Sequence, residues 1–387
     1  MKAKKFIATT LAAATCLAAV GCSPAANGTE NPQEPVTEIR DFTDENFVNL
    51  YGRTYYNEDM RGIAFVNSAS GFEVRFCGTN LVMNAQSAGA WESMFSVFVD
   101  GEEDSNARVV VVENSPFGNY NSVVLAQNLS DTEHTVKVFK RTPSNRDTTL
   151  ISSVSTDGEF LPAPERPAIR MDVYGDSITC GEGIMREVRY DAATGRYEDS
   201  KVYTAFTQNV MQTYAAVAAQ KLGAEFRVYG RGGIAMKYPY AGTKHTVLEN
   251  PAAVAVDLDP GDYPYDYASW TPDVVVIYLG TNDYGARGVN ADYSLDGLKT
   301  AFAQFITEIV GRYYGKEIPI VLCSGMMAAG SGLGQCMRGV KSMLVSQFPN
   351  LDTVEFSPCA VGHPVVEENR VAGELLAAKI SKLLVRQ

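Results

Sequence analysis

The sequence has few cysteines and histidines, and it has a deficit of basic residues. Its seven cysteines include no CxxC pair and follow no metal-finger spacing. Five of them lie beyond residue 22, so at least one stays a free thiol; we expect small core residues, although a Cys323–Cys336 bridge is possible. Lys and Arg number 33 against 45 Asp and Glu, a formal net charge of −12. This balance argues against nucleic acid or an anionic membrane face as a partner and favours a neutral substrate.

Long apolar runs are also scarce, and the longest lies at the N-terminus. Three lysines precede the apolar stretch 6–20, which has the length of a signal peptide and is too short to span a membrane. The sequence AVGC at 19–22 resembles a bacterial lipoprotein signal. We expect a signal peptide over 1–22 with a lipid on Cys22, and a protein anchored at the bacterial cell surface or on the periplasmic side of a membrane. Ala19 stands where such signals usually have Leu, so plain secretory cleavage is the alternative.

The segment 23–39 is small, polar and Pro-containing, which predicts a flexible linker. Residues 40–160 then have the pattern of an all-β domain. Short runs rich in Val and Phe alternate with Gly, Asn and Asp at strand-plus-turn spacing, which predicts a β-sandwich of the jelly-roll kind. Three prolines within 161–168 fit neither a helix nor a central strand, so we place the domain boundary there.

Residues 168–387 alternate predicted strands with predicted helices. This order implies an α/β domain, a parallel sheet with helices on both faces. The run DVVVIYLG is nearly all apolar, as expected for a strand that is covered on both faces. We expect strands at 169–175, 225–230, 273–280 and 318–325, and helices at 213–223, 295–314 and 368–385.

Small and polar residues follow three of these strands. The sequences are GDS at 175–177, GRGG at 230–233 and GTND at 280–283. Because the carboxyl ends of parallel strands meet at one edge of the sheet, these segments should lie close together. The sequence therefore predicts a functional site at this edge.

Ser177 can act as a nucleophile only if a nearby base accepts its proton, and histidine is the usual base near neutral pH. The chain has three histidines. His134 alternates with valines in a predicted strand and should be structural, and His245 lies in a loop. His363 precedes the last predicted helix, where a short turn could direct it to the sheet edge. Elimination favours His363.

A developing oxyanion also needs hydrogen-bond donors. The backbone N–H of Ser177 is one candidate. Gly232 allows a second N–H to approach closely, and the side-chain amide of Asn282 could be the third. The alternative is that the glycines only form turns and that Asn282 only caps a loop.

The segments GDSIT, the later Gly, GTND and HP resemble the four sequence blocks of the SGNH hydrolases. With YGRGG, TPDVVVIYLGTND and the preceding β domain, nearly the whole mature chain is similar to the family 2 carbohydrate esterases. The resemblance implies a jelly roll followed by a flavodoxin-like SGNH domain that removes acetyl groups from plant polysaccharides or oligosaccharides, such as xylan, mannan or glucomannan, without metal or other cofactor. It implies Ser177 as nucleophile, His363 as base, and an oxyanion hole of Ser177 N–H, Gly232 and Asn282. Gly233 is a close alternative to Gly232.

One departure concerns the acid that SGNH enzymes usually place two or three residues before the histidine. Val361 and Ala360 occupy those positions, and Glu355 is the nearest preceding carboxylate. Because some members of the family work with a Ser–His dyad, we expect a dyad in which a backbone carbonyl orients the imidazole. Asp176 should brace the turn rather than serve as the acid.

Further residues near the predicted edge have two interpretations. Glu182 and Asp283 could act on substrate, but they could equally accept loop N–H groups. Tyr284 is our candidate for stacking on a sugar ring. The acidic, aromatic stretch 257–267 lacks the ligand spacing of an EF-hand, so we expect a rim or lid there.

The main hypothesis is a carbohydrate O-acetylesterase, expected as a monomer on a lipid anchor. A lipase or thioesterase on the same scaffold is one alternative. A non-catalytic glycan-binding protein carrying a degenerate hydrolase is the other.

Overall fold

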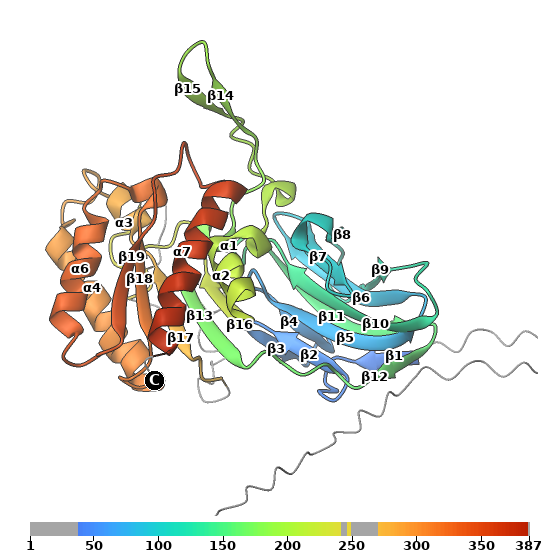
Figure 1. The fold of residues 1–387 in the computed structure, drawn as a ribbon. Helices are drawn as coiled ribbons and strands as arrows, with labels where there is room; N and C mark the ends of the chain where they lie inside the picture. Colours follow the sequence, from blue (N-terminus) through green and yellow to red (C-terminus); the bar gives the residue numbers. More distant parts are fainter. Residues whose placement is uncertain (1–37, 241–245, 249–269, 386–387) are drawn as a thin grey trace, which may run out of the picture.

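The computed structural model describes residues 38–240, 246–248 and 270–385. The predicted signal peptide, linker residues 23–37, His245 and the stretch 257–267 lie outside the described residues. Residues 38 and 39, predicted as the end of the flexible linker, instead begin the first strand of the β domain. Figure 1 shows an antiparallel β-sandwich beside an α/β domain. None of the helices in the described ranges is long and apolar enough to cross a membrane.

The sandwich consists of two antiparallel sheets of six strands each. The first sheet has the order β3 (Thr54–Asn57), β4 (Gly62–Phe65), β11 (Asp147–Thr156), β6 (Leu81–Gly89), β9 (Asn121–Ala126), with β1 (Glu38–Asp41) on β11. The second has the order β12 (Glu159–Leu161), β5 (Gly71–Gly78), β10 (Thr132–Lys140), β7 (Ser93–Val99), β8 (Arg108–Val112), with β2 (Val48–Tyr51) on β5. Alternate residues of the strands point inward, and Phe42, Phe65 and Phe72 meet edge to face in the core between the sheets.

The α/β domain is built on a five-stranded parallel sheet. Its order is β16 (Ala224–Gly230), β13 (Ile169–Gly175), β17 (Val274–Tyr278), β18 (Ile320–Ser324), β19 (Leu351–Glu355). In β17, Val274 and Val276 pack in one core cluster, while Val275 and Ile277 pack in the other. A strand that alternates between two cores is covered on both faces, which confirms the predicted class.

Helices lie on both sides of this sheet (Figure 1). One face is covered by α2 (Tyr214–Leu222) and α7 (Val366–Leu384), and the other by α4 (Leu295–Phe305) and α6 (Leu333–Leu344). Gly223 ends α2 with a φ of 61°, in the left-handed region that glycine favours. The short helices α1 (Ser177–Cys180), α3 (Thr281–Gly285) and α5 (Gly311–Tyr313) complete the domain, with 3-10 turns at Ala205–Thr207, Val210–Gln212 and Met326–Ala328; a further 3-10 turn, Asp104–Asn106, lies between β7 and β8 of the sandwich.

Two further predictions need correction, and some elements were not expected. The helix expected over 295–314 changes to π-helical geometry at Ile306–Val310 and ends as the short α5. Cys323 and Cys336 are free thiols, so the possible bridge between them is not formed. Unexpected elements include α6, β19 and the hairpin of β14 (Val188–Asp191) and β15 (Arg196–Asp199).

Polar contacts join the sandwich to the α/β domain. Asn67 donates to the carbonyl of Val228 (3.1 Å), and Arg141 donates to the carbonyl of Gln208 (2.9 Å). Arg146 forms an ion pair with Glu182 at 3.4 Å, close in sequence to the short helix that begins at Ser177. The β domain therefore packs directly against the loops at the carboxyl edge of the parallel sheet.

Candidate active site

The three segments singled out in the sequence come together because β13 lies between β16 and β17. Gly175 at the end of β13 is in register with Gly230 on one side and Tyr278 on the other. The loops that follow these strands therefore start side by side, at the edge where α/β folds place their sites.

Ser177 begins the short helix α1, and its neighbours fix the turn. The Asp176 carboxylate accepts from the N–H of Ile178 at 3.0 Å and so caps the helix. Gly175 has to lack a Cβ, because one would lie 1.8 Å from Oγ1 of Thr179. Ser177 is only 8% exposed. The hydroxyl is thus held in a tight turn at the sheet edge, and Asp176 braces that turn.

His363 lies in the loop between β19 and α7, 186 positions from the serine. Its Nε2 atom is 2.8 Å from Oγ of Ser177, a hydrogen-bond distance. The Glu368 carboxylate accepts from the N–H groups of Ala360 (2.6 Å) and Val365 (2.8 Å), which fixes the loop on both sides of the histidine. The structure therefore brings the predicted nucleophile and base together.

The other ring nitrogen of His363 faces a hydroxyl. Nδ1 lies 3.2 Å from the OH of Tyr203, which is its only hydrogen-bond partner among the residues that the structure describes. Glu355 pairs with Arg338 at 2.9 Å instead of approaching the ring. The structure thus places neither a carboxylate nor the expected backbone carbonyl at Nδ1.

Burial and a nearby cation act on the charge of the imidazole. Burial and the Arg186 guanidinium lower the pKa of His363 to about 4, while the Asp199 carboxylate has a smaller raising effect. The imidazole is therefore neutral at neutral pH, the state in which Nε2 can accept the serine proton.

Asn282 and Asp283 lie at the start of α3. The amide of Asn282 donates to the carbonyl of Ile234 (2.9 Å) and, at a longer 3.3 Å, to Asp176. Asp283 is buried and accepts from three backbone N–H groups, those of Met236, Lys237 and Tyr238, at 2.7–2.8 Å. Asp283 therefore holds the loop after β16 against Asn282. Burial raises the pKa of Asp176 to about 7, with Asp283 and Glu182 adding to the rise.

Gly232 lies where a side chain would not fit. A Cβ there would lie 2.7 Å from Oε2 of Glu182 and 3.3 Å from Nδ2 of Asn145, a residue of the β domain. Gly233 adopts a left-handed φ of 77°. The Glu182 carboxylate pairs with Arg146 of the β domain at 3.4 Å.

The remaining candidates are placed as follows. Tyr284 packs partly buried against the core under α4, with the Arg287 guanidinium 4.7 Å from its ring centre. His134 has the expected structural role, because its Nδ1 lies 2.7 Å from the Asp100 carboxylate. No cluster of metal-ligating side chains occurs within the ranges that the structure describes.

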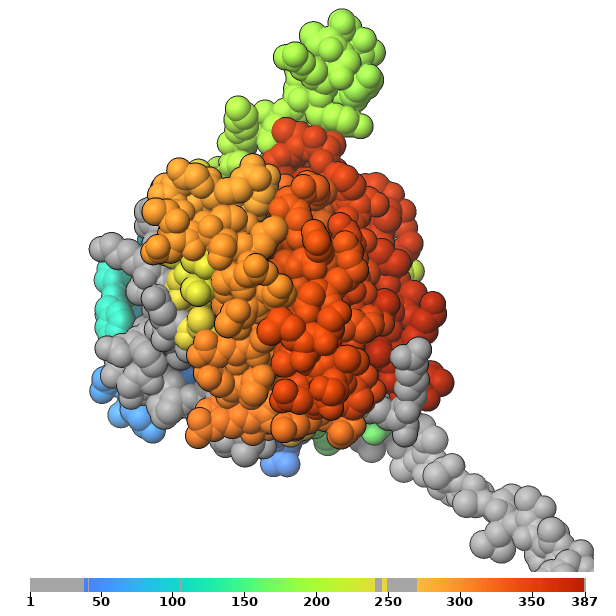
Figure 2. All heavy atoms as spheres, turned by 90° about the vertical axis from the view of Figure 1, so that its left-hand side faces the viewer, coloured from blue at the N-terminus to red at the C-terminus, as the bar shows by residue number. Residues whose placement is uncertain are grey.

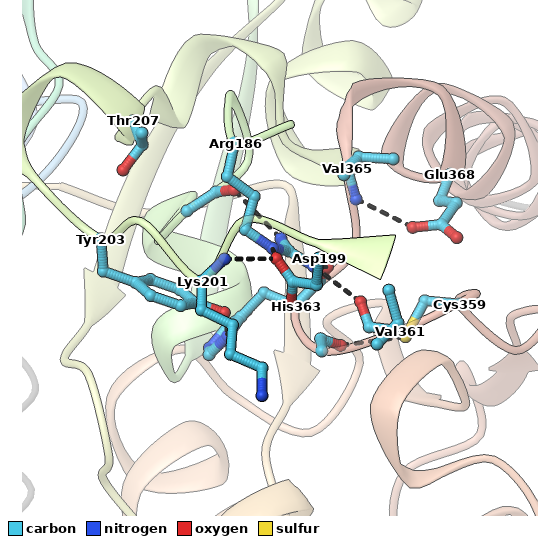
Figure 3. Close-up of polar contacts among 12 residues, drawn as sticks. Arg186, Asp199, Lys201, Tyr203, Thr207, Cys359, Val361, His363, Val365 and Glu368 are labelled. Carbon is cyan, nitrogen blue, oxygen red and sulfur yellow. Dashed lines mark hydrogen bonds and ion pairs between the residues drawn. The ribbon is translucent and has the colours of Figure 1, made fainter. Parts of the chain in front are cut away.

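Sequence reasoning missed Arg186 and Tyr203, which flank the hairpin. Both contact the His363 loop (Figure 3). They lie in a polar, aromatic insertion between α1 and α2 that matches no motif, and Tyr203 is 160 positions from His363. The one signal in the sequence was the absence of an acid two or three residues before His363, since the Nδ1 atom then needs a different hydrogen-bond partner.

Two family models match the chain. "GDSL-like Lipase/Acylhydrolase" matches residues 173–359, and "Carbohydrate esterase 2 N-terminal" matches residues 50–164. The parallel sheet with its Ser–His pair thus defines the class of GDSL-like ester hydrolases. With the additional match of the β domain, the chain belongs to family 2 of the carbohydrate esterases.

Among curated proteins, the chain is similar to the cellulase/esterase CelE of Acetivibrio thermocellus, with 25% identity over 356 residues, 87% of this chain and 39% of that protein. It is also 25% identical over 240 residues to the acetylxylan esterase / glucomannan deacetylase of Cellvibrio japonicus, 61% of each chain. The chain therefore spans less than two thirds of either relative.

Solved structures of the family have the same fold. A family two carbohydrate esterase from Clostridium thermocellum in complex with cellohexaose matches with a TM-score of 0.73 at 25% identity, over 87% of this chain and 99% of that one. A family two carbohydrate esterase from Cellvibrio japonicus matches with a TM-score of 0.75 at 19% identity, over 90% and 98%.

Proposed function

We propose that the protein is a carbohydrate O-acetylesterase that works with Ser177 and His363. The observation that supports this most is the 2.8 Å contact between Nε2 of His363 and Oγ of Ser177 at the edge of the parallel sheet. The neutral state of His363 fits the role of a general base. The acetyl group is proposed from the similar proteins, one of which is named an acetylxylan esterase / glucomannan deacetylase.

In the proposed reaction, Oγ of Ser177 attacks the acetyl carbonyl carbon while Nε2 of His363 takes the hydroxyl proton. His363 then gives this proton to the sugar oxygen, which leaves as an alcohol. Water attacks the acetyl-enzyme with the same base, and acetate is released. Each cycle consumes one ester and one water and restores Ser177 and His363.

We place the oxyanion among the N–H of Ser177, the N–H of Gly232 and the amide of Asn282. The contact from Asn282 to Asp176 is the longer of its two, at 3.3 Å, while the contact to the Ile234 carbonyl is 2.9 Å. We therefore expect the proton that faces Asp176 to turn to the oxyanion and the bond to Ile234 to stay.

The substrate is proposed to be an acetylated plant polysaccharide or oligosaccharide, such as xylan, mannan or glucomannan. The acidic chain favours a neutral polymer over a polyanion. A sugar ring at Tyr284 remains part of this proposal. A lipase or thioesterase would use the same Ser–His pair, and a glycan-binding protein would use neither residue as a reagent.

The test compares the wild-type protein with Ser177→Ala and His363→Ala on acetylated xylan and acetylated glucomannan. Acetate release should fall by about 10³-fold or more in both variants, because nucleophile and base act as a unit. A long-chain p-nitrophenyl ester run beside p-nitrophenyl acetate separates acetylesterase from lipase. Unchanged acetate release by Ser177→Ala would show that this site does not carry the reaction.

We also propose that Cys22 is lipidated and anchors the protein, by the resemblance of residues 19–22 to a lipoprotein signal. Expression of the full chain in a bacterium fed a labelled fatty acid tests this. Wild-type protein should carry the label in the membrane fraction, and Cys22→Ser should not. Label on both proteins, or on neither, would contradict the anchor.

A further inference from the structure

We propose that the Tyr203 hydroxyl takes the place of the absent acid and positions the His363 imidazole. The Arg186–Asp199 ion pair keeps the segments that carry Tyr203 and His363 in contact. This inference rests on the proposed function, since it concerns how the same base is oriented. The geometry that carries it is the 3.2 Å contact between Tyr203 OH and Nδ1 of His363, on the opposite side of the ring from the serine.

Tyr203 is held in place by its surroundings. Its ring meets the His363 ring edge to face, with 5.5 Å between ring centres. The ring also packs closely on Gly183, where a Cβ would lie 2.4 Å from it. The Arg186 guanidinium lies 5.8 Å from the ring centre. A half-buried tyrosine fixed in this way presents its hydroxyl at one place, as a positioning group must.

Arg186 joins the hairpin to the histidine loop (Figure 3). Its Nη2 atom donates to the carbonyls of Val361 (2.6 Å) and His363, and its Nη1 atom donates to the carbonyl of Gly183 at 3.0 Å. Its Nε atom pairs with Asp199 at 2.9 Å, and both side chains of this pair are buried. Arg186 thus binds the carbonyls of Val361 and of His363 itself, and the group that meets Nδ1 is the Tyr203 hydroxyl.

A hydroxyl can donate or accept, and in the proposed arrangement the Tyr203 hydroxyl accepts from Nδ1–H, which is the tautomer that catalysis needs. With Nδ1–H donating to the Tyr203 oxygen, the lone pair of Nε2 is left to face Ser177. Burial raises the pKa of Tyr203, so the group stays a neutral phenol at neutral pH. A carboxylate at the same place would also stabilise the imidazolium, which the neutral hydroxyl does less. The device therefore orients the base without adding a negative charge to it.

The position of the hairpin makes this possible. Figure 2 shows the hairpin standing out from the molecule above the C-terminal segment that carries the histidine loop. Arg186 precedes β14, Asp199 ends β15, and Tyr203 follows four residues later. The insertion between the nucleophile helix and α2 thus returns to the active site and supplies the partner that positions 360 and 361 lack.

The experiment replaces only the hydroxyl, in Tyr203→Phe, with Tyr197→Phe as the matched control on the exposed part of the same insertion. With p-nitrophenyl acetate, Tyr203→Phe should lower kcat by about 10- to 100-fold with little change in KM. This is less than the roughly 10⁴-fold loss known for disabling a triad carboxylate, because the hydroxyl orients the base but adds no charge. Tyr197→Phe should match the wild type.

A second readout separates positioning from a general structural effect. The chain has only three histidines, so ¹⁵N-histidine NMR can report the tautomer of each ring. His363 should carry its proton on Nδ1 in the wild type and become a mixture of tautomers in Tyr203→Phe. The His134 signals should not move, which shows that the variant is folded.

An unchanged His363 tautomer in Tyr203→Phe would overturn the proposal, whatever happens to kcat. An unchanged kcat would overturn it as well. Failure of the proposed function gives a different result, because Ser177→Ala would then keep the esterase rate while the NMR result still reports on the Tyr203–His363 contact.

Discussion

Arg186 and Asp199 form a buried ion pair at the base of the β14–β15 hairpin, with Nε 2.9 Å from Oδ1. The pair is also connected to the active site, since Arg186 donates to the carbonyls of Val361 and His363. An inserted hairpin and the loop of the proposed base therefore form one hydrogen-bonded unit. Changes to this unit should affect stability and catalysis together.

Arg186→Gln should destabilise the protein, because it leaves the Asp199 carboxylate buried without its cation. Loss of one partner of a buried pair typically costs about 3–5 kcal/mol. Urea unfolding followed by circular dichroism measures this. The control is Arg189→Gln, whose partner Glu187 is exposed, so a change of at most about 0.5 kcal/mol is expected. Equal losses in the two variants would contradict the structural role of the pair.

The pH dependence of kcat/KM should reflect the lowered pKa of His363. The base works when neutral, so the loss of activity that comes from protonation of His363 should occur as the pH drops through about 4. An exposed histidine would give a midpoint near its usual pKa of about 6.5. The profile should be recorded from acid to neutral pH, with circular dichroism in the same buffers to show that the fold persists. A midpoint near 6.5 would be inconsistent with the buried environment of the imidazole.

Gly362→Ala should lower activity because the new Cβ would collide with the Arg186–Asp199 pair, and not through backbone strain alone. Gly362 has a φ of 59°, and a Cβ there would lie 2.8 Å from Oδ2 of Asp199 and 3.0 Å from Nη2 of Arg186. We expect kcat/KM to fall about tenfold or more as His363 shifts, since small displacements of a base are costly. Gly315→Ala is the control, because its φ of 86° imposes similar strain with no atom within 4 Å of the Cβ. Equal activity of both variants would refute this explanation.

Asp283→Asn should loosen the loop after β16. The carboxylate accepts three backbone N–H bonds, and an amide would turn its NH₂ group toward at least one of these donors. A hydrogen bond to a charged group is worth about 1.5–3 kcal/mol, so we expect a loss of at least that size. Activity should fall too, because Asn282 is the adjacent residue. Thermal unfolding and acetate release of Asp283→Asn, compared with the exposed Asp292→Asn, measure both effects. Wild-type stability of Asp283→Asn would contradict the bracing role.

The elements that sequence reasoning predicted well are those with a strong local signal. The strand over 273–280 was evident from its apolar run and the helix over 213–223 from its terminal Gly223, and β17 and α2 confirm both. The proximity of the three segments that follow the strands could be predicted, because the carboxyl ends of parallel strands lie at one edge of the sheet. The pairing of Ser177 with His363 was predicted from the scarcity of histidine and from the resemblance to SGNH hydrolases, and the structure places the two side chains 2.8 Å apart.

The parts that were not predicted depend on contacts between distant segments. The hairpin carries exposed residues such as Tyr190 and Tyr197, so it lacks the buried face that gives a half-buried strand its alternation of apolar and polar residues. β19 is short and has a charged residue at position 352, where Asp352 pairs with Lys341 and Lys379. The contact between Tyr203 and His363 spans 160 positions and has no sequence pattern. A carbonyl was expected at Nδ1, but the sequence could not show that the insertion between α1 and α2 places the Tyr203 hydroxyl there.

The central claim is that Ser177 attacks an acetyl ester with His363 as its base. The most direct measurement mixes the wild-type protein with p-nitrophenyl acetate, quenches it in acid during turnover, and maps acetylated peptides by mass spectrometry. The account predicts one acetyl group on Ser177, absent in Ser177→Ala and in His363→Ala. Full acetate release with Ser177 never acetylated, or equal turnover by Ser177→Ala, would contradict it.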